Sequence, residues 1–327
     1  MDRLQLAFAT LALLAIACFV APAHAGTPQD VAGPILLEPL SIARRWMGAA
    51  SASNYSSGLG RSDFFGFAGG DISDAAASCQ NSLKNNIDLF VSVLGSKPQN
   101  QCVGIGCLTL SVSRSFTSGV GVTFPPNTGL TPRRSGYLIF AGGLQCAPTG
   151  QRVASGVVDV LALSNVQMLA PMTLPSGPRN HIATSSICKW ISQQSKYSCL
   201  AFFAGGQGPV NTYTNAIDVL DLNPDSPVFL SSMQLTVARA FLASASFPDS
   251  MLFAGGKNES KQSFTALGQV DYFQCSTFNQ CSIVDTGKLL SSPRFDLAAA
   301  GLSVILSDTT YTPPSPPPAP ALRSPNV

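Results

Sequence analysis

A four-residue segment, Phe-Ala-Gly-Gly, occurs four times in this chain of 327 residues, each time at the end of a short apolar run. The glycine pairs are tens of residues apart, and an identical motif at such intervals indicates repeated units, as in a solenoid, a propeller or an array. Such a repeat strongly constrains the fold, because each unit must bury its apolar faces against its neighbours. The pairs are Gly69 and Gly70, Gly142 and Gly143, Gly205 and Gly206, and Gly255 and Gly256.

Two further marks accompany each glycine pair. An apolar run with a central aspartate follows it, and an arginine with a small residue four positions later precedes it. A fifth arginine, Arg294, has Ala298 four positions later but no glycine pair after it. The sequence therefore predicts four complete units and a fifth that begins at Arg294. The other repeated residues are Arg44, Arg114, Arg179 and Arg239, and Asp88, Asp159, Asp218 and Asp271.

Each unit is expected to form four short strands, which in the last complete unit are "LASASF", "SMLFAGG", "QVDYF" and "CSIVDT". Small residues on the first strand suit crowding near a central axis. Glycines at the end of the second strand allow a positive φ or a close backbone approach. One four-stranded sheet cannot bury both of its faces, whereas sheets stacked radially around an axis can.

These marks resemble the kelch-repeat β-propeller, whose unit has an apolar strand ending in Gly-Gly, a strand with an apolar-Asp-apolar core, and an arginine opening the next unit. The resemblance covers Arg44 to Ile305. It implies an all-β propeller of about five four-stranded blades, regular or irregular, closed by an N-terminal strand at 34–42. The kelch tyrosine and tryptophan are missing, and Met168 and Phe229 stand near the place of the tryptophan. Insertions such as "PQNQCVGIGC" lengthen some units beyond the usual ~50 residues.

The two ends of the chain differ from this pattern. An apolar run from Leu6 to Val20, followed by "APAHA", predicts a secretory signal peptide over residues 1–25, and the alternative is an uncleaved membrane anchor. We expect the propeller to occupy residues 26–308 and a Pro-rich, extended tail to occupy 309–327. The "SPPP" of the tail resembles hydroxyproline-rich wall glycoproteins of plants and green algae. That resemblance implies an extracellular matrix or cell-wall location, and the alternative is an end without a role.

Nine cysteines are present, and eight remain once Cys18 is removed with the signal peptide. An even number in a secreted chain predicts disulfides. On kelch-type blades, three pairs flank strand connections or a hairpin, and the remaining two cysteines follow the glycine pairs of neighbouring blades. Metal binding is the alternative for the close pairs, although no histidine lies near them. The expected pairs are Cys102 with Cys107, Cys188 with Cys199, Cys275 with Cys281, and Cys79 with Cys146; Asn54 and Asn258 begin N-glycosylation sequons.

The repeated residues are expected to be structural. The glycine pairs fit neither the Walker motif nor the Gly-x-Gly-x-x-Gly motif of phosphate-binding loops, and no helical pattern follows them. Aspartates distributed around a ring do not converge on one substrate, which favours hydrogen bonds to backbone amides or to a repeat arginine. A copper oxidase of the galactose-oxidase kind needs paired histidines, but the mature chain has one, His181, which we interpret as a strand-end residue. We therefore expect no catalytic, metal-binding or cofactor-binding residues.

Binding remains as the expected activity. Charged residues make up 11% of the chain and the net charge is +2, so no strong field would attract nucleic acid or an anionic membrane. Propeller loops carry recognition, and the insertions around Trp190 and Cys102–Cys107 are the most individual. The sequence predicts a secreted, monomeric, non-catalytic binding or scaffold module for an extracellular protein or glycan, with no stable membrane anchor. The alternative is an extracellular carbohydrate-active enzyme, either a hydrolase or a degenerate oxidase.

Overall fold

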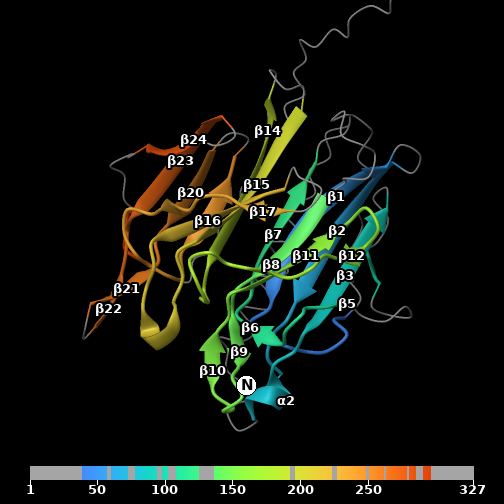
Figure 1. The fold of residues 1–327 in the computed structure, drawn as a ribbon, viewed down its shortest axis with the longest axis horizontal. Helices are drawn as coiled ribbons and strands as arrows, with labels where there is room; N and C mark the ends of the chain where they lie inside the picture. The colour runs from blue at the N-terminus through green and yellow to red at the C-terminus, as the bar shows by residue number, and fades with distance from the viewer. Residues whose placement is uncertain are drawn as a thin grey trace, which may run out of the picture.

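The computed structural model is an all-β assembly of antiparallel sheets (Figure 1). It describes residues 39–56, 60–72, 78–93, 98–101, 108–124, 136–191, 196–222, 227–247, 250–260, 263–277, 280–284 and 290–295. The α-helix in these ranges, α2 (Cys79–Ser82), and the 3-10 helix η2 (Pro209–Asn211) are single turns within connections between strands.

Four sheets share one plan. The strand that follows a repeat arginine lies at one edge, the strand ending in Phe-Ala comes second, and the strand with the repeat aspartate comes third, followed by one or two short strands. The first sheet contains β1 (Gly48–Ser56), β2 (Gly60–Ala68), β3 (Asn86–Val93), β4 (Gln99–Asn100) and β5 (Leu108–Thr109). The second contains β7 (Ser118–Thr123), β8 (Gly136–Ala141), β11 (Val157–Ala162), β12 (Gln167–Met168) and β13 (Met172–Thr173).

The other two large sheets repeat this order with different hairpin lengths. The third contains β14 (Ala183–Ile191), β15 (Lys196–Ala204), β16 (Ala216–Asp221), β17 (Val228–Phe229) and β18 (Met233–Gln234). The fourth contains β19 (Ala243–Ser246), β20 (Ser250–Ala254), β23 (Val270–Thr277) and β24 (Gln280–Val284).

Two small sheets continue from the glycine pairs. One contains β6 (Arg114–Ser115), β9 (Leu144–Cys146) and β10 (Arg152–Ala154), and the other contains β21 (Lys257–Ser260) and β22 (Ser263–Ala266). Figure 1 shows these strands and α2 at the lower end of the molecule, whereas the long β14–β15 hairpin reaches the opposite end. We call the end that carries the glycine pairs the Gly-Gly end.

The large sheets are apolar on both faces because each inner sheet packs between two neighbours. All six residues of β8 are buried. Ile139 faces a cluster shared with Phe203 of the third sheet, while its neighbour Phe140 faces a cluster shared with Phe64 of the first. The core is therefore divided into layers between successive sheets, and the alternation of side chains along each second strand supplies both layers.

The first strands of neighbouring sheets approach closely. A Cβ on Gly119 of β7 would lie 2.4 Å from the Ala49 carbonyl oxygen of β1, and one on Gly121 would lie 1.7 Å from that of Ser51. On its other side, β7 accepts a hydrogen bond at the Gly119 carbonyl from Thr184 Oγ1 of β14, at 2.7 Å. Small and hydroxyl-bearing residues on these strands therefore permit backbone-to-backbone packing.

The N-terminal segment differs from the expectation. Residues 39–42 form no strand. Asn100 Nδ2 donates to the Pro39 carbonyl at 3.3 Å, and the Ser41 N–H donates to Asp88 Oδ1 at 2.9 Å. Side chains of the first sheet thus bind the backbone groups that a strand would use. Residues 34–38, the expected signal peptide over 1–25, the rest of the fifth unit and the tail over 309–327 lie outside the described residues.

Met168 and Phe229, near the position of the kelch tryptophan, contribute to the packing between sheets. Met168 is partly buried against the cluster between the first and second sheets. Phe229 packs on the cluster between the second and third sheets, with its ring centroid 6.2 Å from that of Phe203.

Candidate functional site

The repeat arginines and aspartates form four buried ion pairs. The Arg44 and Asp88 side chains approach to 2.6 Å with no exposed surface on either. A charge buried alone is costly, so each residue of a pair depends on the other. The remaining pairs are Arg114 with Asp159 at 2.6 Å, Arg179 with Asp218 at 2.8 Å, and Arg239 with Asp271 at 2.8 Å.

Further hydrogen bonds enclose each pair. Arg114 also donates to the carbonyls of Val157 and Phe140, at 2.8 and 3.0 Å. Asp159 accepts from the backbone N–H of Ser111, three residues before that arginine. The same position supplies a backbone N–H to the aspartate in the other three pairs, from Ser41, Ser176 and Thr236. Sequence reasoning missed this fourth mark, although a serine or threonine stands three residues before every repeat arginine, including Ser291 before Arg294.

The arginines stay charged in these surroundings. Burial lowers the pKa of Arg114 to about 10, against the opposing effect of Asp159. Burial likewise lowers the pKa of Arg44, Arg179 and Arg239, and in each case the paired aspartate raises it. Because a guanidinium group is a very weak acid, each of the four arginines keeps its positive charge at neutral pH. Their arrangement supports a structural role within each unit.

The glycine pairs join one unit to the next. Gly142 has φ +63°, and a Cβ there would lie 2.4 Å from the Arg179 carbonyl oxygen. Its neighbour Gly143 has φ +104° and donates its N–H to that same carbonyl at 3.0 Å. Gly70, Gly206 and Gly256 donate in the same way to Arg114, Arg239 and Arg294. The pair therefore serves as a compact junction between one unit and the next.

Four rings lie in a row at the Gly-Gly end. They belong to Trp46, Phe116, His181 and Phe241, each two residues after a repeat arginine, and we call them the aromatic row. Successive ring centroids are 4.5, 4.5 and 3.7 Å apart. The Phe116 N–H donates to the Trp46 carbonyl at 2.8 Å, and the Phe241 N–H donates to that of His181 at 3.3 Å. One ring from each unit thus continues the contact between neighbouring units.

The backbone of the aromatic row is in an unfavourable region. Trp46, Phe116, His181 and Phe241 have φ values of 57°, 53°, 52° and 59°. A residue with a bulky side chain pays about 1–3 kcal/mol for such a conformation, so surrounding contacts must maintain it. The same unfavourable φ at the equivalent position of four units indicates that the contacts of the stacked rings maintain this backbone conformation. Aromatic character two residues after the arginine was visible in the sequence but was not singled out.

Cations cover both ends of the aromatic row. The guanidinium carbon of Arg45 lies 4.0 Å from the centroid of Trp46, and Lys257 Nζ lies 4.0 Å from that of Phe241. Lys257 also lies 5.4 Å from the ring centroid of Phe295. Cations over ring faces are attracted by the ring quadrupole. The row therefore combines four aromatic rings with two positive charges.

His181 occupies the interior of the row. Its Nδ1 contacts Asn180 Oδ1, and its ring lies between Phe116 and Phe241. Burial, followed by the charge of Lys257, lowers the pKa of His181 to about 4. The imidazole is therefore neutral at neutral pH and packs as an aromatic ring. His181 lies between the isolated bridge of Asn180 with Gln207 and the start of β14 at Ala183.

Three disulfides are present in the described residues: Cys79–Cys146, Cys188–Cys199 and Cys275–Cys281. The first joins α2 to β9, which follow the glycine pairs of the first two units. Nearby, Arg152 and Asp71 form a 2.6 Å ion pair between the same two units. Three disulfides indicate an oxidising environment. The expected Cys102–Cys107 pair lies outside the described residues.

The remaining expected site residues are dispersed. Trp190 lies on β14 opposite Tyr197, in the hairpin that points away from the Gly-Gly end, and its side chain lies outside the described part. Asn54 is half-buried on β1, with Nδ2 donating to the Leu163 carbonyl at 3.5 Å, and Asn258 is half-buried on β21. Arg294 is exposed and donates to Ser292.

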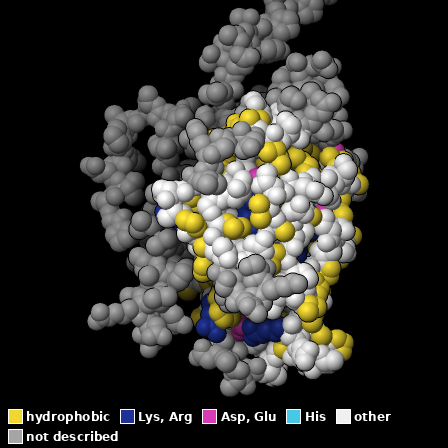
Figure 2. Space-filling model, turned by 90° about the vertical axis from the view of Figure 1, so that its left-hand side faces the viewer, with side chains coloured by type: hydrophobic (Ala, Val, Ile, Leu, Met, Phe, Trp, Pro, Cys, Tyr) yellow, Lys and Arg dark blue, Asp and Glu magenta, His cyan; other side chains and the backbone are white. Residues whose placement is uncertain are grey.

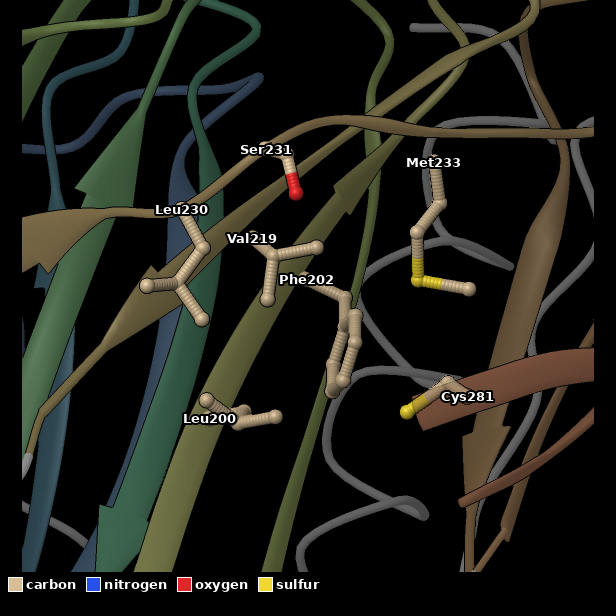
Figure 3. Close-up of a pocket in the computed structure, with 7 residues that line it drawn as sticks. All are labelled: Leu200, Phe202, Val219, Leu230, Ser231, Met233 and Cys281. Atoms are coloured by element: carbon tan, nitrogen blue, oxygen red, sulfur yellow. The ribbon is translucent and has the colours of Figure 1, made fainter. Parts of the chain in front are cut away.

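A small pocket of about 190 Å³, lined mainly by apolar side chains, lies between the third and fourth sheets (Figure 3). Its lining is Leu200, Phe202, Val219, Leu230, Ser231, Met233 and Cys281. One hydroxyl among apolar groups offers little for recognition or catalysis. In the described ranges, no cluster of three or more His, Cys, Asp or Glu residues could hold a metal ion.

Comparison with known proteins leaves the family open. No family model matches the chain, and no curated protein matches it. One matching solved structure, titled "Structure of YjhT", is 11% identical, with a TM-score of 0.46 over 79% of this chain and 74% of that chain. Fold details and function must therefore be argued from the residues of this chain.

Proposed function

We propose that the chain is a secreted kelch-type β-propeller that acts as a non-catalytic binding module and recognises its ligand at the Gly-Gly end. Four sheets with equivalent strand order, closely packed first strands and glycine junctions between units support a propeller. The fifth blade then begins at Arg294, whose carbonyl accepts a hydrogen bond from the Gly256 N–H. The carbonyls of Arg114, Arg179 and Arg239 accept the equivalent hydrogen bonds from Gly70, Gly143 and Gly206. The disulfides support secretion.

The burial and ion pairing of the repeated aspartates support a binding function over a hydrolytic one. General acid–base catalysis requires a carboxyl group within hydrogen-bond reach of the substrate. Asp88, Asp159, Asp218 and Asp271 are instead buried, with exposures of 0–1%, and each is paired with an arginine. These carboxylates hold the entry of each unit to its own sheet.

The single observation that carries the site assignment is the aromatic row with its two cations. It draws one residue from each of four units, and it keeps a strained backbone at all four positions. Trp46 at one end of the row is 40% exposed. Aromatic residues and arginine are the residue types that most often dominate binding energy at interfaces.

A binding screen with the mature chain, residues 26–327, tests this function. The protein is applied to a glycan array and to an array of secreted proteins, in parallel with an activity screen on sugars and oligosaccharides. We expect a saturable ligand and no turnover. Turnover that one carboxylate-to-amide substitution abolishes in a folded protein would overturn the non-catalytic assignment. The absence of any saturable ligand would overturn the binding function.

The helices of the described residues include none long and apolar enough to span a membrane.

A further inference from the structure

The Cys275–Cys281 disulfide joins directly opposed residues of neighbouring strands. Cys275 of β23 is the register partner of Cys281 of β24, in the antiparallel pair that ends the fourth sheet. The Cβ atoms of opposed residues are ordinarily about 4.5–5.5 Å apart, whereas those of a relaxed disulfide are about 3.8 Å apart. The bridge therefore draws the two strands together, and the register shifts between Cys275 and Thr277 beside it. Disulfides under strain are easier to reduce than relaxed ones.

The two cysteines of this bridge differ in their access to solvent. Cys275 is buried, whereas Cys281 is only partly buried. Cys281 lines the pocket between the third and fourth sheets, and Figure 3 shows its sulfur directed toward Phe202. Ser231 lines the same pocket and is exposed, so the pocket reaches the surface. A small solute that enters it can therefore reach the sulfur of Cys281.

The surroundings of the pocket do not repel an anion. Its lining consists of uncharged residues. The fourth sheet lies at the left of Figure 1, and Figure 2 shows that side of the molecule, where the described side chains are mostly uncharged and a group of Lys and Arg lies at the lower end. An anionic thiol such as glutathione therefore meets no like charge among the residues that line the pocket.

The Cys188–Cys199 disulfide has the same register but less access. Cys188 of β14 lies directly opposite Cys199 of β15. Cys199 is fully buried, and Cys188 Sγ lies 3.4 Å from the Thr123 carbonyl oxygen of β7. These two strands lie second and first in their sheet, where the neighbouring sheet packs against them. Thiol attack on this bridge should therefore be slower.

The Cys79–Cys146 disulfide provides the opposite contrast. It joins α2 to β9, which are not paired strands, so no strand register constrains it. Its cysteines are 67 residues apart in sequence, whereas Cys275 and Cys281 are 6 apart. A bridge that closes a short loop restricts the unfolded chain less, so the protein should stay folded when Cys275–Cys281 is reduced.

We propose that Cys275–Cys281 is a redox-labile disulfide, and that a small thiol of the glutathione type exchanges with it at Cys281. The glutathione thiolate attacks Cys281 Sγ, so a mixed disulfide forms and the bond to Cys275 breaks. Cys275 leaves as a thiolate and takes a proton from water. A second glutathione thiolate then attacks the sulfur of the bound glutathione, which releases oxidised glutathione and leaves Cys281 as a thiol once it is protonated. Two glutathione molecules thus supply the two electrons, and the exchange is independent of ligand binding at the Gly-Gly end.

A glutathione titration of the mature chain without denaturant tests the proposal. The protein is equilibrated at increasing ratios of reduced to oxidised glutathione, quenched with acid, labelled with N-ethylmaleimide and digested. Mass spectrometry then quantifies the free thiol and the glutathione adduct at each cysteine. We expect Cys275–Cys281 to be half-reduced at a ratio at least about tenfold lower than Cys79–Cys146, with adducts on Cys281 in preference to Cys275. Circular dichroism at that ratio should still show the native fold.

Three results of this titration would overturn the proposal. Half-reduction of Cys275–Cys281 at the same ratio as Cys79–Cys146, or at a higher one, would show that the bridge is not labile. Adducts mainly on Cys275 would show that the wrong sulfur was assigned to the attack. Loss of the native fold together with reduction would show that the bridge is structural.

Two tryptophan variants test the route of attack. Ser231→Trp places a large ring at the exposed edge of the pocket. Val228→Trp is the matched control, because Val228 of β17 is 48% exposed and lies outside the pocket lining. Reduction of Cys275–Cys281 by excess glutathione should be about tenfold slower in Ser231→Trp and within about twofold of the wild-type rate in Val228→Trp. Thermal unfolding checks that both variants are folded, and equal rates in the two would overturn entry through the pocket.

Discussion

The Arg114 guanidinium and the Asp159 carboxylate lie 2.6 Å apart, and their side chains are 0% and 2% exposed. Asp159 lies on β11, the third strand of the second sheet, whereas Arg114 precedes the first strand of that sheet by four residues. The pair therefore fastens the entry of each unit to the interior of its sheet, and the same relationship recurs in four units.

Removing one partner of this pair should destabilise the fold strongly. Asp159→Asn leaves the Arg114 charge buried without its counter-ion, which costs about 3–5 kcal/mol in comparable cases. Urea unfolding followed by fluorescence measures the loss. Asp63→Asn is the matched control, because Asp63 pairs with exposed Arg61 and such surface pairs contribute about 0–1 kcal/mol. Equal losses in the two variants would show that burial of the repeat pair is unimportant.

The glycine junction should not tolerate a side chain. Gly142→Ala places a Cβ 2.4 Å from the Arg179 carbonyl and keeps a positive φ of 63°, so we expect a loss of several kcal/mol, the sum of strain and overlap. Gly150→Ala has a similar φ of 81° but meets no atom within 4 Å. It should cost only about 1 kcal/mol. Thermal unfolding of both proteins distinguishes overlap from conformational strain, and a Gly150→Ala variant as unstable as Gly142→Ala would contradict the junction.

His181 should make stability pH-dependent on the acid side. Its pKa is lowered to about 4 in the folded state from 6.5, so the unfolded chain binds the proton more readily. Stability is therefore complete above pH 6.5 and declines as the pH falls towards 4. The full shift corresponds to about 3 kcal/mol, an upper limit that partial exposure reduces. His181→Phe keeps a ring in the row and should flatten this part of the profile relative to wild type. An unchanged slope between pH 6.5 and 4 would contradict a neutral, buried imidazole.

The disulfide between units should stabilise more than those within hairpins. Cys79 and Cys146 are 67 residues apart in sequence, whereas Cys275 and Cys281 are 6 apart. Loop-closure entropy grows with the enclosed length, so Cys79→Ser with Cys146→Ser should cost about 4 kcal/mol. The corresponding double substitution of Cys275 and Cys281 should cost less. The two melting temperatures, measured against wild type, give the order, and the reverse order would argue against the entropic explanation.

The sequence predicted the all-β class and the order of strands in each unit. Its repeated residues mark equivalent strands, because the arginine precedes the first strand, Phe-Ala-Gly-Gly ends the second and the aspartate lies in the third. It also predicted that the aspartates bond to backbone amides or to a repeat arginine, and in the structure each of the four does both. The prediction of an N-terminal strand was wrong at residues 39–42, because side chains such as Asn100 hydrogen-bond to the backbone groups of this segment. No local sequence pattern reveals a hydrogen bond between residues so far apart in the chain.

The aromatic row was overlooked for a different reason. Trp46, Phe116, His181 and Phe241 share a position but no single residue type, and their stacking depends on a positive φ that the sequence does not encode through glycine. The sequence instead favoured Trp190, because it lies in an inserted hairpin. The structure places that hairpin away from the Gly-Gly end. The rings and cations of successive units come together at the Gly-Gly end.

Hydrogen–deuterium exchange of the mature chain, with and without the ligand found by the arrays, locates the binding surface most directly. We expect slower exchange at the Gly-Gly end, in segments 45–47, 114–117, 209–213 and 257–260, and unchanged exchange at the far ends of the β1–β2 and β14–β15 hairpins. Protection confined to those far ends, with the Gly-Gly end unaffected, would contradict it.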